Sequence, residues 1–356
     1  MRRSPASVTS SAARGAGCTS LVPHYQGGQP EIVLGDLLAA DRDQFVLATK
    51  YTRGSAGRTR INDTGNSRKT MIRSLEASLK RLGTDYVDVY WAHLPDTITP
   101  VDEIVAAFDD LVRAGKILHG GLSNFPAWRV ATAVTIAELR DRAPVIGIQV
   151  EYSLADRTAE RELLPMAEAF GLGAALYAPL AGGLLTGKYR LSPEGRLSRR
   201  GAGVHIEDSE HKTAVLDGIL AIAEESGTSA AQVSVAWLRA RAARASTSLI
   251  PVIGPRTTAQ LDEYLAALDL VLTNEQYDRL EQASTVALGT PHETAAAGLG
   301  GDAARIRRHP VPVICPQLRP HLTGTATGRR RSKKAWAVAT ARQAIVFLFP
   351  ASRRHS

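Results

Sequence analysis

Residues 85–93 read Asp-Tyr-Val-Asp-Val-Tyr-Trp-Ala-His, a stretch rich in Val and Tyr that favours a buried β-strand. Apolar residues recur at helical spacing before it, in residues 71–82, and after it, in residues 104–112, and a glycine follows each run. In a (β/α)8 barrel, a strand flanked by helices ends at the face that holds the active site. His93 is therefore the first candidate site residue, although a lone histidine is more often a core or loop residue.

The alternation of strand and helix continues along the chain and indicates a parallel sheet with right-handed crossovers. The predicted strands are residues 44–50, 85–93, 117–123, 145–150, 173–177 and 249–253. The predicted helices are residues 29–40, 67–82, 101–114, 126–140, 158–170, 211–226, 229–243, 257–268 and 273–283. We predict an α/β fold, a (β/α)8 TIM barrel that is incomplete at the N-terminus. Because a closed barrel needs eight strands and only six are clear, we expect one side to stay open.

The positive charge of the chain is concentrated at its two ends. Its 43 Lys and Arg exceed its 35 Asp and Glu, but residues 1–20 hold three Arg and residues 303–356 hold twelve Lys or Arg, with no acid in either segment. The part between them carries a net charge of −7, which disfavours a nucleic-acid partner. We predict a disordered start at residues 1–20, a domain at residues 21–313 and a basic, disordered tail at residues 314–356. No stretch of 18 apolar residues occurs, so we expect no membrane span and a cytoplasmic location.

Polar residues gather where successive predicted strands end: Lys50, His93, Ser123 with Asn124, Gln149 and Tyr177. These positions would line one face of the barrel. Five stretches then resemble the aldo-keto reductase superfamily, in the branch of bacterial general-stress reductases and potassium-channel β-subunits: residues 45–50, 74–93, 115–124, 177–189 and 251–263. The resemblance covers about residues 21–300.

The resemblance implies reduction of aldehydes or ketones by hydride transfer from NADPH. It places the proton donor at Tyr25, in His-Tyr-Gln-Gly-Gly, and its ammonium partner at Lys50. A free tyrosine has a pKa near 10, so a neighbouring ammonium is needed to stabilise its anion. His93 matches the residue that orients the carbonyl group.

The resemblance also implies the NADP(H) site. Ser123, Asn124 and Gln149 match residues that hold the nicotinamide carboxamide, and Tyr177 matches the aromatic residue that stacks on the ring. The remaining matches, for the pyrophosphate and the adenosine end, are Ala178, Pro179, Leu180, Gly182, Lys188, Gly254, Arg256, Gln260 and Glu263. No metal site is predicted.

The chain departs from the family pattern at three places. Ser20 stands where the family has an aspartate five residues before its tyrosine, and Tyr264 stands where an asparagine is usual. The first strand–helix unit has no counterpart, so we expect impaired catalysis. An alternative function is therefore a catalytically impaired NADP-binding protein that senses its cofactor or binds a partner. The substrate beyond a small carbonyl compound and the oligomeric state stay open.

Overall fold

The eight strands in the part of the chain that the structure describes form one closed parallel ring, β1 to β8 in chain order. The computed structural model describes residues 18–20, 28–54, 63–192, 205–298 and 345–346. The strands are β1 (Cys18–Ser20), β2 (Val46–Tyr51), β3 (Val87–Ala92), β4 (Ile117–Ser123), β5 (Val145–Glu151), β6 (Gly173–Tyr177), β7 (Leu249–Ile253) and β8 (Ile345–Val346). The predicted TIM barrel is confirmed, and the six predicted strands are β2 to β7.

The strands of the ring are shortest where the first and the last strand pair with each other. β1 has three residues and β8 has two, and Cys18 pairs with Ile345. β8 also pairs with β7, through Val252 and Ile253. Apart from these two short strands, which the sequence pattern did not reveal, the ring consists of the six strands β2 to β7, in agreement with the predicted incomplete (β/α)8 barrel. Both short strands lie outside residues 21–313, and the rest of the predicted tail lies outside the described residues.

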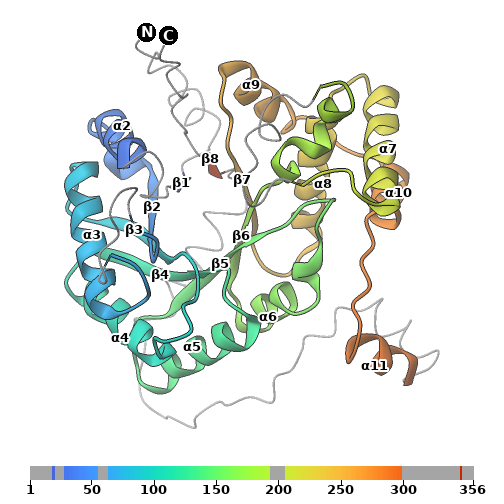
Figure 1. Ribbon diagram of the computed structural model, residues 1–356. Helices are drawn as coiled ribbons and strands as arrows, with labels where there is room; N and C mark the ends of the chain where they lie inside the picture. The colour runs from blue at the N-terminus through green and yellow to red at the C-terminus, as the bar shows by residue number, and fades with distance from the viewer. Residues whose placement is uncertain (1–17, 21–27, 55–62, 193–204, 299–344, 347–356) are drawn as a thin grey trace.

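Helices cover the outside of the ring, as Figure 1 shows. They are α2 (Gln29–Leu38), α3 (Arg68–Leu82), α4 (Val101–Arg113), α5 (Ala127–Leu139), α6 (Leu163–Phe170), α7 (Glu210–Glu225), α8 (Ala230–Arg244), α9 (Thr258–Ala266) and α10 (Asn274–Ala283). A further short helix, α11 (His292–Gly298), follows α10 and lies apart from the ring. The predicted helices match α2 to α10 to within a few residues at their ends. Among the described helices, none combines the length and apolar character that crossing a membrane requires.

A buried ion pair fixes the first helix to the barrel. Glu31 of α2 is fully buried and accepts hydrogen bonds from Thr49 Oγ1 of β2 at 2.6 Å and from Arg81 Nε of α3 at 2.6 Å. A buried carboxylate needs such partners, because burying a charge without them is costly. The pair therefore holds α2 against both β2 and α3.

Two adjacent glycines of β4 let large side chains approach the strand from both faces. Successive residues of a strand face opposite sides of the sheet. A Cβ at Gly120 would lie 2.7 Å from Cγ of Phe108, which packs from α4. A Cβ at Gly121 would lie 2.4 Å from Cζ3 of Trp91, which fills the barrel interior together with Ala48, Val89, Ala175, Ile250 and Val252. The Gly-Gly pair is thus a packing requirement.

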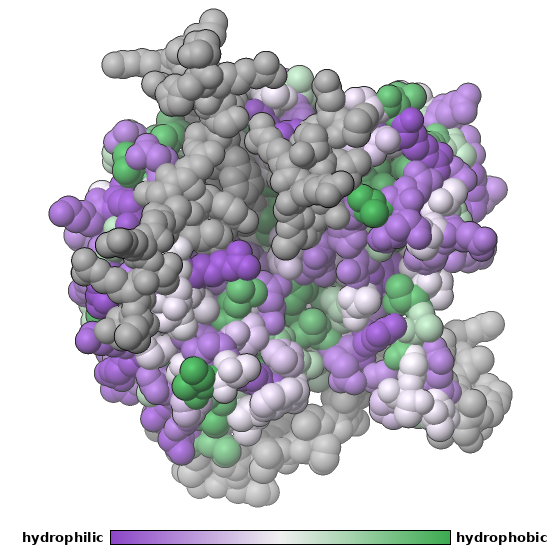
Figure 2. Space-filling model, in the orientation of Figure 1, coloured by the Kyte–Doolittle hydropathy of each residue, from purple (hydrophilic) through white to green (hydrophobic). Residues whose placement is uncertain are grey.

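The space-filling view shows one face of the molecule (Figure 2). Apolar side chains appear in the hollow between the side of α3, α4 and α5 and the side of α7, α8 and α10. Polar side chains cover both flanks of that hollow.

We expect Gly121→Ala to lower the free energy of unfolding by about 1–3 kcal/mol, because the new methyl group overlaps the Trp91 ring. Urea unfolding followed by circular dichroism measures this change. Gly218→Ala in α7 is the matched control, since its Cβ would lie 3.9 Å from that of Ala283, an ordinary contact. Equal stability of the Gly121→Ala variant and the unmutated protein would contradict the packing account.

Candidate functional site

The carboxyl ends of β2 to β6 bring the predicted strand-end residues to one end of the barrel. Lys50 follows Ala48 by two residues in β2, so both face the interior, and Lys50 is only 2% exposed. Ser123 and Gln149 pair with each other across β4 and β5, and both are buried. Tyr25, the predicted proton donor, lies outside the described residues.

His93 is held by hydrogen bonds of its backbone to the two neighbouring loops. Its N–H donates to Oγ1 of Thr52, which follows β2, at 3.2 Å. Its carbonyl accepts from Nδ2 of Asn124, which follows β4, at 3.0 Å. His93 is therefore positioned by the ends of three strands, as its place at the end of a strand predicts.

Asn124 connects the ends of four strands. Its backbone φ of 60° lies in the left-handed region, which asparagine tolerates better than most residues. This conformation accompanies three further contacts: its N–H donates to the carbonyl of Gln149 at 3.0 Å, its Nδ2 to Ser123 Oγ at 3.1 Å, and its Oδ1 accepts from the Tyr177 hydroxyl at 2.8 Å. The four predicted nicotinamide contacts thus form one hydrogen-bonded group.

Gln149 supplies a direct test of whether this group suits a nicotinamide. Its side chain is 2% exposed, and within the described part of the chain no hydrogen-bond partner reaches its buried Nε2. A buried amide N–H without an acceptor costs about 1–3 kcal/mol. A carboxamide oxygen bound beside it would remove that cost, so the residues present fit the cofactor.

The segment after β6, which is predicted to cover the pyrophosphate, forms a series of tight turns. Residues with positive φ recur in it: Ala178 (56°), Ala181 (48°), Gly182 (69°) and Gly183 (108°). These residues let the chain turn within a short distance, and two turns are closed by hydrogen bonds from the Ala181 N–H to the Ala178 carbonyl and from the Gly183 N–H to the Leu180 carbonyl, both at 2.8 Å. The Tyr189 hydroxyl donates to the Gly182 carbonyl at 3.0 Å, which holds the turn in place.

The other residues that are predicted to contact the phosphates lie in the same segment. A Cβ at Gly183 would lie 3.2 Å from Lys188 Nζ, so Lys188 approaches the turn that contains Gly182. Pro179 is buried, whereas Leu180 is half-buried. Lys188 Nζ lies 5.0 Å from the centroid of the Tyr189 ring.

The predicted adenosine residues surround the start of α9. Gly254 follows β7, and the N–H of Arg256 donates to Oε1 of Gln260 at 2.7 Å. Gln260 N–H in turn donates to Oγ1 of Thr257, the N-cap residue of α9, at 3.2 Å. The Oε1 atom of Gln260 therefore holds the backbone of the loop between β7 and α9. The side chains of Arg256 and Glu263 are half-buried.

Asn66 and Asp96 belong to the site region, and the sequence analysis missed them. Asn66 is fully buried; its Oδ1 accepts from Thr52 Oγ1 at 2.6 Å, and its Nδ2 donates to the Leu94 carbonyl at 2.9 Å. Asp96 Oδ2 accepts from the N–H of Asn66 at 2.6 Å. These contacts join the loops on both sides of His93. A polar loop residue gives no periodic signal, so only the folded loops reveal this network.

The Asp96 carboxylate makes the stability of this network depend on pH. Partial burial alone would raise its pKa, but hydrogen bonds from the backbone N–H groups of Asn66 and Thr99 outweigh burial and lower it. A lowered folded-state pKa stabilises the fold above the unfolded-state pKa, and this stability is lost as pH falls through the folded value.

We expect Asp96→Asn to lower the free energy of unfolding at pH 7 by about 1.5–3 kcal/mol, the usual worth of hydrogen bonds to a charged group. The difference should shrink as pH falls below the unfolded-state pKa of about 3.9 and through the lower folded-state pKa of Asp96. Urea titrations at a series of pH values measure both effects. Asp85→Asn, at an exposed position, should change little. A difference that stays constant from pH 7 to pH 3 would contradict this role of the carboxylate.

Comparisons with known proteins agree with this geometry. The aldo/keto reductase family matches residues 15–285. Norsolorinic acid reductase A of Aspergillus parasiticus is 33% identical over 273 residues, 75% of this chain and 68% of the relative. The uncharacterised oxidoreductase YrpG of Bacillus subtilis is 39% identical over 253 residues, 70% and 75% of the two chains. A putative voltage-gated potassium channel subunit beta of Schizosaccharomyces pombe is 35% identical over 270 residues, 72% and 77% of the two chains. The chain, with oxidoreductases among its relatives, belongs to the aldo/keto reductase family.

Proposed function

We propose that this protein reduces the carbonyl group of small aldehydes or ketones to an alcohol, with NADPH as the hydride donor. The observation that carries the proposal is the buried amide of Gln149, held beside Ser123, Asn124 and Tyr177 with its Nε2 available for an acceptor. When bound there, the cofactor supplies a hydride to the carbonyl carbon. The residues of the chain supply binding, orientation and a proton.

Tyr25, Lys50 and His93 together deliver a proton to the carbonyl oxygen of the substrate. As the carbonyl carbon gains a hydride, its oxygen gains negative charge and needs a proton donor within hydrogen-bond reach. Tyr25 has this role through the family resemblance, and its hydroxyl proton goes to the oxygen. Lys50 is buried at the end of β2, where low dielectric strengthens the attraction between an ammonium and a tyrosinate. His93, fixed by Thr52 and Asn124, orients the carbonyl.

We expect Lys50→Met and Tyr25→Phe each to lower kcat for an aromatic aldehyde by at least about 100-fold, the usual contribution of general acid–base catalysis. NADPH affinity, measured by fluorescence titration, should change much less. Lys80→Met is the matched control, because Lys80 is exposed on α3. A Lys50→Met variant that keeps the unmutated kcat would contradict the assigned role of Lys50.

The second candidate function is an NADP-binding protein with impaired turnover. Ser20 favours it, because it pairs with Ala48 of β2, two residues before Lys50, and offers no carboxylate there. The potassium channel subunit beta among the relatives also favours it. Tight NADPH binding by the unmutated protein, with no turnover of any aldehyde or ketone offered, would select this function over the first.

Cofactor choice depends on Arg256. A guanidinium matches a phosphate with two parallel hydrogen bonds, so Arg256 at the start of α9 should favour the 2′-phosphate of NADP(H). We expect Arg256→Ala to reduce the ratio of the NADH and NADPH dissociation constants at least tenfold. Arg279→Ala, which removes an exposed ion pair with Glu225, is the control. Equal dissociation constants for both cofactors in the unmutated protein would contradict this prediction.

A further inference from the structure

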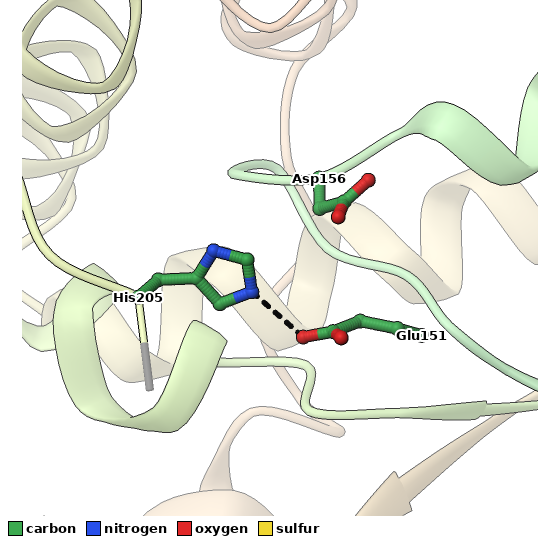
Figure 3. A group of neighbouring side chains, drawn as sticks. All are labelled: Glu151, Asp156 and His205. Atoms are coloured by element: carbon green, nitrogen blue, oxygen red, sulfur yellow. Dashed lines mark hydrogen bonds and ion pairs between the residues drawn. The ribbon is translucent and has the colours of Figure 1, made fainter. Parts of the chain in front are cut away.

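A histidine and two carboxylates meet at the end of β5, outside the residues assigned above. Glu151 is the last residue of β5, Asp156 follows in the connection to α6, and His205 lies just before α7. One side-chain ligand atom of each lies within 4.8 Å of those of the other two. Figure 3 shows the imidazole of His205 directed at the Glu151 carboxylate, with Asp156 beside them.

The spacing of these atoms suits a single divalent ion. His205 Nε2 lies 2.7 Å from Glu151 Oε1. Adjacent ligands at right angles on an ion with bonds of about 2.1 Å lie about 3 Å apart, so a small movement would admit an ion in place of the hydrogen bond. The side chains of His205 and Glu151 are 17% and 24% exposed, which leaves a route for an ion and for water ligands.

The backbone around Asp156 holds its carboxylate in place. Ser153 and Asp156 exchange two backbone hydrogen bonds, of 3.0 and 3.1 Å, in a tight turn. Thr158 donates its N–H and its hydroxyl to Asp156 Oδ1 at 3.0 and 2.6 Å. The next residue, Arg157, is buried and donates to Glu281 Oε2 of α10 at 2.8 Å. Because these contacts already hold the Asp156 carboxylate, little conformational entropy of this side chain is lost when an ion binds.

The charge of the cluster also favours a cation. Two carboxylates face one imidazole, and the nearby Lys212 of α7 pairs with Asp208 at 2.8 Å. One imidazole and two carboxylates are ligands that first-row transition ions accept, whereas Ca²⁺ and Mg²⁺ prefer oxygen alone.

We propose that Glu151, Asp156 and His205 bind one first-row divalent transition ion such as Zn²⁺, with water completing its coordination. The sequence alone predicts no metal site, because the ligands come from two segments 54 residues apart with no recognisable spacing. The ion connects the end of β5 to the segment that enters α7. Glu151 pairs with Tyr177 and follows Gln149 by two residues, so the ion braces the strand end that carries the predicted nicotinamide contacts.

The test is a Co²⁺ titration of the full chain after treatment with a chelator, read from the visible absorption of bound Co²⁺. We expect one equivalent to bind and Zn²⁺ to displace it. His205→Ala and Glu151→Gln should each weaken the affinity at least tenfold, with unchanged circular dichroism spectra. Excess Zn²⁺ should raise the Tm of the unmutated protein by a few degrees and that of His205→Ala less.

His292→Ala is the matched control. His292 Nε2 also contacts a glutamate, Glu162 Oε1 at 3.0 Å, but this pair is not part of a three-ligand group among the described residues. Its variant should bind Co²⁺ like the unmutated protein. The proposal is overturned if the unmutated protein binds no Co²⁺, if His205→Ala binds it equally well, or if His292→Ala loses as much affinity.

Discussion

The amide side chain of Asn124 is the contact on which the site depends. It donates to the carbonyl of His93, and it accepts from the Tyr177 hydroxyl. These bonds connect the strand ends of β3, β4 and β6, while the Asn124 N–H adds β5 through the Gln149 carbonyl. A parallel barrel brings strand ends to one face, but it does not by itself fix their side chains relative to one another. Asn124 supplies that fixation.

The side chains inside the barrel change from apolar in the middle to polar at the carboxyl ends of the strands. Apolar residues such as Val89 and Trp91 fill the middle, packed against glycine at position 121. Near the carboxyl ends of β2 and β5 stand Lys50, which pairs with Trp91 in register, and Gln149, each 2% exposed. Burying an ammonium and an amide costs stability, so these residues make the mouth of the barrel the costly part of the fold. A bound cofactor that accepts from Gln149 would offset part of this cost and stabilise the protein.

The sequence predicted the fold well where its periodicity was strong. All six long strands and nine helices follow from alternation and from runs such as residues 85–93, with differences of a few residues at the ends. β1 and β8 could not be predicted, because strands of three and two residues carry no period. The ring closes through pairing between segments at opposite ends of the chain, which no local pattern encodes.

In the site, too, positions with a local sequence pattern could be predicted, and contacts that depend on the fold could not. The positions of Lys50, His93, Ser123, Gln149 and Tyr177 could be predicted, since each lies at or next to the carboxyl end of a strand. The contacts of Asp96 with Asn66 could not, because they depend on how two irregular loops meet. The pairing of His205 with Glu151 across 54 residues depends on the fold in the same way. Roles that rest on the resemblance alone, above all that of Tyr25, stay predictions.

The central claim is that this group of strand-end residues holds a nicotinamide ring in one orientation beside a carbonyl substrate. Reduction of an aromatic aldehyde with NADPH deuterated on one or the other face of C4 tests it directly, with mass spectrometry of the alcohol as the readout. The account predicts that one labelled cofactor transfers its deuterium to the product and the other transfers none. Deuterium transfer from both, or no alcohol from either, would contradict it.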